Sequence, residues 1–238
     1  MPETTPPPQP RRATTPVTTG VRAYSARVPD GQSRAARKEA TRRRLVAVTL
    51  GLIANRSLAS ISLREVARAA GIVPTAFYRH YQSMDHLGVE LVDESMRPLR
   101  QMLRDARRGV AGHGDIIRAT IAVLSRHVRE HPDQFRFLVR ERYGGVRQVR
   151  RAIDTELTLF TSELTVDLAR LTAGYDWSAD DLEMTADLMV AAMLKAIMDL
   201  LELDLRPAGR RADESAILER AERQLRLIAL GMSEWRSK

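Results

Sequence analysis

Residues 62–87 have the sequence SLREVARAAGIVPTAFYRHYQSMDHL, which carries several signals for where short helices start and stop. The opening serine and the glutamate three positions later have the spacing of a capping box, which begins a helix. Gly71 is the residue type that ends a helix, and Pro74 is tolerated in the first turn of the next one. The stretch therefore predicts two short helices, residues 63–70 and 74–81, joined by a tight turn that contains glycine.

Two helices joined in this way form a helix-turn-helix, whose second helix enters the major groove of DNA with its first residues against base edges. In this chain those residues are Pro74, Thr75 and Ala76. The methyl groups of threonine and alanine suit the thymine methyl group. Tyr78 and His80 are better placed to donate to the DNA backbone. A helical hairpin with an aromatic lid is the alternative, and the two helices alone do not decide between the interpretations.

Positive charge is concentrated around this unit. Residues 31–82 hold 10 basic and 2 acidic side chains. Residues 1–110 carry 19 Lys and Arg against 9 Asp and Glu, whereas residues 111–238 carry 19 against 21. This asymmetry indicates that one end of the protein faces a polyanion, which favours DNA binding. Arg79 would belong to the outward-facing basic surface, whereas Phe77 is expected in the core.

The rest of the chain has apolar residues at helical spacing and no convincing alternating strand, so the predicted fold class is all-α. Residues 1–32 are rich in Pro, Thr and Arg and are predicted to be a disordered tail. Residues 33–82 are predicted to form a three-helix DNA-binding domain, and residues 83–238 a helical bundle for ligand sensing and dimerisation. Besides the short pair, helices are expected at residues 33–54, 83–108, 115–130, 132–142, 146–173, 179–204 and 213–235.

The helix expected over residues 179–204 is apolar nearly all round, so more than one of its faces must be covered. The final helix, residues 213–235, offers a second apolar stripe. Two such helices from each chain would form a four-helix interface, so we expect a homodimer.

Other classes of protein are disfavoured. The chain has no cysteine and no run near the ~20 apolar residues of a membrane span, so we expect a cytoplasmic protein without membrane contact. His127 and His131 have a spacing that can bind metal, but no third ligand is evident and a structural role is favoured. No G-x-S-x-G motif frames a nucleophile. We therefore expect no enzymatic activity, no metal and no cofactor.

The opening stretch resembles the DNA-binding domain of the TetR family of bacterial transcriptional repressors, through Gly71, the pair Phe77 and Tyr78, and Leu87. The segments ARKEATRRRLVAVTL, LGVELVDESMRPLRQMLRDAR and HPDQFRFLVRERYGG are similar to the FabR/DesT-like repressors of unsaturated fatty-acid biosynthesis. The resemblance covers roughly residues 34–145. It implies a dimeric repressor that binds double-stranded, palindromic operator DNA. A nonspecific nucleic-acid binder is the alternative, although it would not need the second, neutral to acidic half of the chain.

Carried over by position, the resemblance assigns DNA contacts to the first three helices. Ser62, Tyr78 and His80 would hold phosphate, whereas Arg64 and Thr75 would lie against bases. The expected DNA-contacting residues are Arg37, Lys38, Thr41, Arg42, Ser62, Arg64, Pro74, Thr75, Ala76, Tyr78, Arg79 and His80.

The resemblance also implies an effector that is a long-chain fatty acyl group, as acyl-CoA or free fatty acid. Each buried CH₂ of such a chain contributes ~0.8 kcal/mol, and methionine suits a pocket for chains of differing shape. The expected ligand-contacting residues are Met96, Leu99, Leu103, Ile121, Leu124, Phe135, Leu138, Arg140, Arg142, Phe160, Leu188 and Met189, with the two arginines facing an anionic head group. Most of the apolar ones are equally suited to an ordinary core. The alternative is a regulator of drug efflux that senses another apolar molecule.

Overall fold

The structure is a computed structural model that describes residues 34–108, 113–172, 177–203 and 210–235. Within these ranges all regular secondary structure is helical, which confirms the predicted fold class. The elements are α1 (Arg34–Ile53), the 3₁₀-helix η1 (Leu58–Ser60), α2 (Leu63–Ala69), α3 (Pro74–Phe77), α4 (Met84–Arg108), α5 (His113–Glu130), α6 (Pro132–Glu141), α7 (Arg147–Leu171), α8 (Ala179–Leu203) and α9 (Arg210–Glu234). The predicted tail, residues 1–32, lies outside the described residues.

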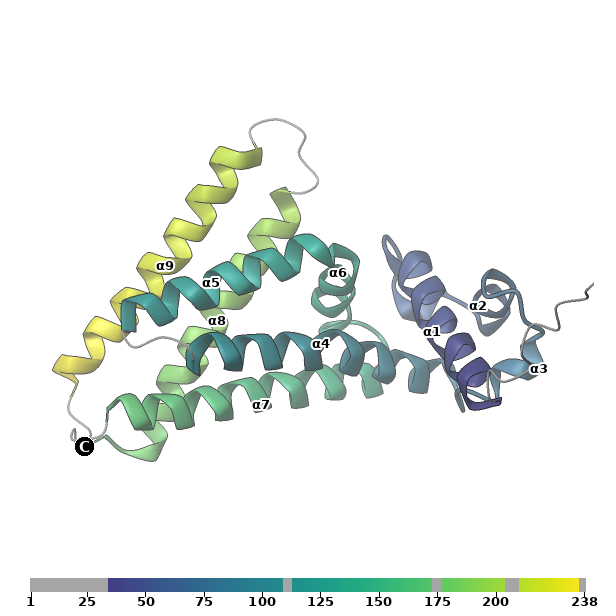
Figure 1. The fold of residues 1–238 in the computed structure, drawn as a ribbon, viewed down its shortest axis with the longest axis horizontal. Helices are drawn as coiled ribbons and strands as arrows, with labels where there is room; N and C mark the ends of the chain where they lie inside the picture. The colour runs from purple at the N-terminus through teal and green to yellow at the C-terminus, as the bar shows by residue number, and fades with distance from the viewer. Residues whose placement is uncertain (1–33, 109–112, 173–176, 204–209, 236–238) are drawn as a thin grey trace, which may run out of the picture.

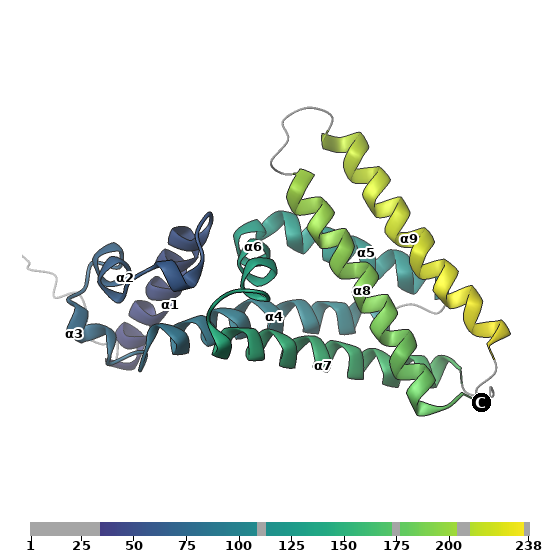
Figure 2. The ribbon, with the colours of Figure 1, turned by 180° about the vertical axis from the view of Figure 1, so that it is seen from behind.

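The helices form an elongated molecule with α1–α3 at one end (Figure 1). Helix α4 leads from this end into the rest of the protein and runs beside α7. Helices α8 and α9 pack against each other, and α5 packs against α4 and α9 (Figure 2). The short α6 contacts α1, so the helical bundle touches the α1–α3 end through both α4 and α6.

Local signals fix the ends of α2. The Ser62 hydroxyl accepts from the Glu65 N–H, and the Glu65 carboxylate accepts from the Ser62 N–H, which completes the predicted capping box. After α2, Gly71 has a φ of 67°, a left-handed conformation that glycine adopts without a steric penalty. The Ile72 N–H then donates to the Ala67 carbonyl at 3.0 Å, as in a Schellman motif. This turn sets the direction in which the chain enters α3.

Helix α3 is shorter than the sequence predicts. Its α-helical part ends at Phe77 instead of continuing to Tyr81. Beyond Phe77 the backbone forms tight turns, in which the N–H of His80 donates to the Phe77 carbonyl at 2.8 Å. The physical reason is a change from i→i+4 to mainly i→i+3 bonding, which tightens the last turn.

One hydrophobic cluster connects α1–α3 to the helical bundle. It contains Leu45, Phe77 and Leu91 together with Phe137 and Val149 from α6 and α7. Gly88 marks a close approach within it: a Cβ there would lie 2.5 Å from a methyl carbon of Leu58 and 2.6 Å from one of Val149. Both ends of the molecule therefore share packing around the start of α4.

None of the helices in the described ranges has the length and apolar character needed to cross a membrane.

Candidate functional site

Most of the residues predicted to contact DNA lie on the surface of α1–α3. Those that are exposed are Arg37, Lys38, Ser62, Arg64, Pro74, Thr75, Tyr78 and Arg79. Tyr78 is 62% exposed, whereas the neighbouring Phe77 is fully buried and meets the Tyr78 ring edge-on with 5.9 Å between centroids. The expected division of this aromatic pair into one core and one surface residue is thus confirmed.

Arg42 is placed differently from the expectation that it braces the DNA backbone. It is half-buried, forms an ion pair with Glu90 of α4, and lies over the ring of the buried Tyr81 at 5.3 Å. The hydrogen bond to Glu90 raises the pKa of the Arg42 guanidinium. Arg42 therefore holds α1 against α4. Thr41 is also half-buried, and its hydroxyl donates to the Arg37 carbonyl at 3.0 Å within α1.

Ser62 and His80 are also constrained by their surroundings. The Ser62 hydroxyl donates to the Glu65 carboxylate at 3.0 Å, and hydrogen bonds from Ser62 lower the pKa of Glu65. A phosphate contact through Ser62 would have to replace that bond. His80 is half-buried like Ala76, and its Nδ1 has no hydrogen-bond partner. Burial and nearby cations such as Lys38 lower the pKa of His80, which favours the neutral imidazole.

Two residues at the end of α6 attach the helical bundle to the α1–α3 end. The Arg140 guanidinium donates to the carbonyls of Ile53, Ala54 and Arg56 at 2.6, 3.0 and 2.7 Å. These carbonyls lie at and just beyond the end of α1, where backbone acceptors lack helical partners. The buried Glu141 accepts hydrogen bonds from Ser57 and Leu58 at the start of η1. We refer to Arg140 and Glu141 as the α6 clamp.

The Glu141 half of the clamp is the more deeply buried. Its side chain is 1% exposed, and its Oε1 accepts from the Ser57 hydroxyl and the Leu58 N–H, each at 2.9 Å. Its Oε2 is buried without a hydrogen-bond partner, beside Gly144. A Cβ on Gly144 would collide with this carboxylate, so glycine leaves the space that the clamp occupies.

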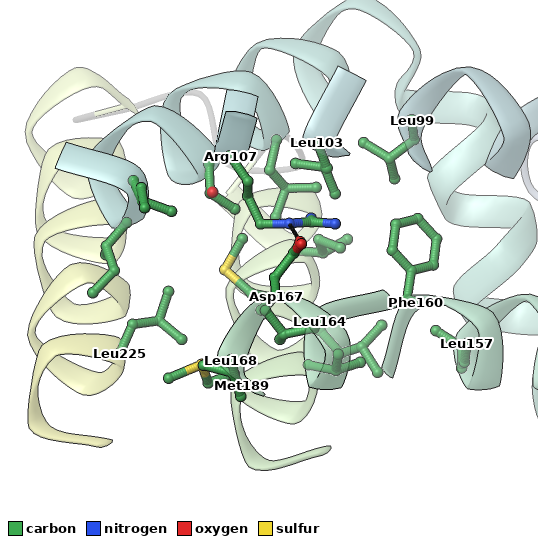
Figure 3. Close-up of a pocket in the computed structure, with 18 of the residues that line it drawn as sticks. Leu99, Leu103, Arg107, Leu157, Phe160, Leu164, Asp167, Leu168, Met189 and Leu225 are labelled. Atoms are coloured by element: carbon green, nitrogen blue, oxygen red, sulfur yellow. Dashed lines mark hydrogen bonds and ion pairs between the residues drawn. The ribbon is translucent and has the colours of Figure 1, made fainter. Parts of the chain in front are cut away.

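A cavity of about 860 Å³ lies in the helical bundle and is lined by residues of α4 to α9. Its volume falls in the usual range for small-molecule sites, ~300–1,000 Å³. Of the residues predicted to contact the ligand, those that line it are Met96, Leu99, Leu103, Leu124, Phe135, Leu138, Arg142, Phe160 and Met189. Figure 3 shows several of these side chains pointing into the space between the helices.

Three of the predicted ligand contacts lie elsewhere. Arg140 belongs to the α6 clamp, because the carbonyls at the end of α1 take up its donors. Ile121 is buried in an apolar cluster beside the cavity, together with Leu168, which does line it. Leu188 is 54% exposed on α8. The three residues therefore do not belong to the lining of this cavity.

The cavity also contains an ion pair that the sequence did not indicate. Arg107 of α4 donates through Nε to the Asp167 Oδ2 of α7 at 2.6 Å, and both side chains line the cavity (Figure 3). The residues lie 60 positions apart, so no local pattern pairs them. Further ion pairs also join α4 to α7, among them Arg100 with Glu156 and Arg104 with Glu163. Glu163 also lies 3.6 Å from Arg100 and 3.8 Å from Arg107. We call the pairs Arg107–Asp167, Arg100–Glu156 and Arg104–Glu163 the α4–α7 ladder.

Among the residues that the structure describes, one group of side chains has a spacing that could hold a metal ion. His127, Glu130 and His131 lie at the junction of α5 and α6, with one ligand atom from each within 4.8 Å of the others. The structure thus places the Glu130 carboxylate close enough to serve as a third ligand, which the spacing of the two histidines alone did not indicate. His127 is buried, its Nε2 has no hydrogen-bond partner, and burial lowers its pKa. A neutral imidazole is the form that binds a divalent ion such as Zn²⁺.

Two family models match the chain. Residues 45–91 match the model for bacterial regulatory proteins of the tetR family, and residues 114–229 match the model for tetracyclin repressor-like C-terminal domains. A helix-turn-helix unit joined to a helical domain with a large apolar cavity is the arrangement of a DNA-binding regulator. The chain belongs to the TetR family of transcriptional regulators, whose members are DNA-binding proteins without enzymatic activity.

Solved structures share the fold at low sequence identity. A transcriptional regulator from Pseudomonas aeruginosa PAO1 aligns with a TM-score of 0.66 and 19% identity, over 83% of this chain and 95% of that one. The fatty acid degradation regulator FadR from Bacillus halodurans gives 0.66 and 13%, over 78% and 94%. AibR, solved in complex with isovaleryl coenzyme A and operator DNA, gives 0.59 and 17%, over 76% and 96%.

Proposed function

We propose that this TetR-family regulator is a ligand-responsive repressor that binds palindromic operator DNA as a dimer. The proposed effector is a long-chain acyl-CoA or fatty acid, and the regulated genes belong to fatty-acid or lipid metabolism. The observation that carries the proposal is the apolar cavity along α4, because α4 begins directly after the helix-turn-helix. A ligand in this cavity touches the same helix that Arg42 joins to α1 through Glu90.

Dimerisation is supported by apolar residues on the surface of α8 and α9. Met184 and Leu188 are 46% and 54% exposed and lie one turn apart on one face of α8. Leu227 on α9 is 72% exposed. Met198 and Leu230 are also exposed, but they line the cavity as well. Large exposed apolar side chains grouped on neighbouring helices are typical of a protein–protein interface. A second copy of the chain, with the same two helices, would cover them symmetrically.

The chemistry of the effector is supported by the cavity and by two of the similar proteins. The cavity is large, and its uncharged lining is mostly leucine, isoleucine, methionine and phenylalanine. FadR from Bacillus halodurans is a regulator of fatty acid degradation, and AibR binds isovaleryl coenzyme A. An acyl chain would gain ~0.8 kcal/mol for each CH₂ that it buries there. A sensor of apolar drugs is the second candidate, since the same lining would accept them.

DNA recognition is tested by selecting a binding site from random duplex DNA with the full chain. We expect an inverted repeat with half-sites about one helical turn apart, ~34–36 Å, modified by the geometry of the dimer. Affinity should be at least roughly 10³-fold higher for this site than for a scrambled duplex at the same salt concentration. Equal affinity for both duplexes, with the same salt dependence, would favour a nonspecific nucleic-acid binder instead.

A further inference from the structure

The charges that line the cavity are unevenly distributed. Arg107, Arg108, Arg142, Arg170 and Arg226 line it, whereas the single acidic residue among its lining residues in the described part of the chain is Asp167. Figure 3 shows Arg107 and Asp167 meeting within a ring of apolar side chains. Glu222 pairs with Arg226 and Glu163 lies 3.8 Å from Arg107 outside the lining, but the charged groups of the lining itself are mainly cationic, which favours an anionic ligand.

The Arg107–Asp167 pair is poorly explained by packing alone. The two side chains are only 11% and 23% exposed, so their charges lose much of their hydration. The pair is also not needed to join α4 to α7, since the other two pairs of the ladder do so. A charged pair that faces an apolar cavity is instead typical of a ligand site.

We propose that the effector binds by anion exchange on Arg107: an acidic group of the ligand takes the place that the Asp167 carboxylate holds in this structure. This rests on the proposed function, in which the cavity is the effector site. The guanidinium binds carboxylate and phosphate oxygens through the same planar set of donors, so it accepts either group in place of Asp167. The released carboxylate keeps a cationic neighbour, because Asp167 lies 3.5 Å from Arg170.

The exchange places the ligand in one orientation. Arg107 lies in the last turn of α4, and Met96 lies 11 positions earlier on the same helix, about 16 Å away along its axis. Leu138 and Phe160 also line the cavity. The acidic group would thus bind at the end of α4 far from α1–α3, and the acyl chain would extend towards Met96 and α6, whose last residues form the clamp.

Arg142 is the competing head-group residue. Its guanidinium lies 5.6 Å from the centre of the Tyr143 ring, and Tyr143 is 79% exposed. Arg142 is half-buried beside this exposed ring, whereas Arg107 already holds a carboxylate within the cavity and its side chain is only 11% exposed. An anionic group gains more from a cation in the less hydrated position.

The experiment measures binding of oleate, oleoyl-CoA and the uncharged oleyl alcohol to the full chain by calorimetry. The variants are Arg107→Gln, Asp167→Asn and Arg142→Gln, with Arg97→Gln as the control, since Arg97 is exposed on α4 and pairs with Asp93. Arg107→Gln should weaken an anionic ligand roughly tenfold or more, the effect of losing a charged hydrogen bond. Asp167→Asn should strengthen it, because the competing carboxylate is gone.

Oleyl alcohol should bind all the variants equally, which also reports that the cavity is intact. A loss confined to oleate identifies the carboxylate as the exchanging group, and a loss confined to oleoyl-CoA identifies its phosphates. If the wild-type binds all three ligands and Arg107→Gln changes none of them, or weakens all three equally, anion exchange is refuted while the lipid effector stands. Binding of none of the three would refute the lipid effector itself, and the exchange with it.

Discussion

Tyr78 and Arg64 are both exposed on α2–α3 but are expected to serve DNA binding in different ways. Tyr78→Phe removes a hydroxyl proposed to donate to phosphate, so affinity should fall by a similar factor on every sequence. Arg64→Ala removes a proposed base contact and should change base preference by about 1–3 kcal/mol at one position. Competition binding against single-base variants of the selected site measures both. A uniform loss for Arg64→Ala on all variants would show that it does not contact a base.

His127 gives a prediction about pH. Because burial and the neighbouring His131 lower its pKa in the folded protein, the unfolded chain takes up this proton first as the pH falls. Stability should therefore be full above the ordinary histidine pKa of about 6.5 and decrease as the pH falls through it. His127→Gln should make the free energy of unfolding less dependent on pH between 7.5 and 5.5, as measured in urea. His80, whose pKa is also lowered, would supply the remainder.

An unchanged pH dependence in His127→Gln would contradict this origin. His131→Gln provides a comparison, since it removes the neighbouring charge that lowers the pKa of His127 and leaves the burial of His127 in place. Metal binding at this cluster is a separate question, and the measurement is made with a chelator present so that the proton is the only ligand that changes.

For single residues, the sequence indicated which type of environment a side chain occupies better than it indicated which partner that side chain contacts. It distinguished Phe77 from Tyr78, because a helical face and its flanking charges are local patterns. It could not distinguish Arg140 from Arg107 as a cation for the ligand. Arg140 bonds to carbonyls more than 80 residues earlier in the chain, and Arg107 pairs with a residue 60 positions later. Which arginine faces the cavity depends on how the helices pack, and spacing along the chain does not contain that information.

The last residues of helix α6 hold the helical bundle against η1 and the end of α1. Glu141→Ala would remove the acceptor of the Leu58 N–H and leave that buried donor unsatisfied, at a cost of about 1–3 kcal/mol. Glu141→Gln retains a carbonyl oxygen in the place of Oε1 and should cost less. Urea unfolding of both variants measures the difference. Equal losses for alanine and glutamine would mean that the hydrogen bonds to η1 do not stabilise the fold.

Helix ends were largely predictable from sequence, and the reason is local chemistry. Pro132 starts α6 as expected, and the predicted helix over residues 179–204 corresponds to α8, Ala179–Leu203. Capping residues, glycine and proline act within a few positions of where they stand. Helix α3 ends early because the turn after Phe77 tightens into i→i+3 bonds, such as that from the His80 N–H to the Phe77 carbonyl.

The whole molecule is predicted to act as a dimer through α8 and α9. Leu188→Glu combined with Leu227→Glu would place charges in the proposed apolar interface, so the variant should sediment as a monomer at micromolar concentration. Its affinity for a palindromic site should fall sharply because two half-sites are no longer bound together. Leu159→Glu is the matched control, since Leu159 is 41% exposed on α7. A double variant that remains dimeric would place the interface elsewhere.

We propose that a lipid in the cavity controls DNA binding by α1–α3. It is tested by titrating the complex of the full chain and its selected operator with saturated and unsaturated acyl-CoAs, free fatty acids and unrelated apolar drugs. A ligand can shift DNA occupancy only if it binds the DNA-bound and free forms with different affinity. We predict that an acyl-CoA or fatty acid changes operator affinity by roughly 5-fold to 150-fold, in either direction, while the drugs do not. A response to the drugs alone would contradict the account and identify the protein as a drug sensor.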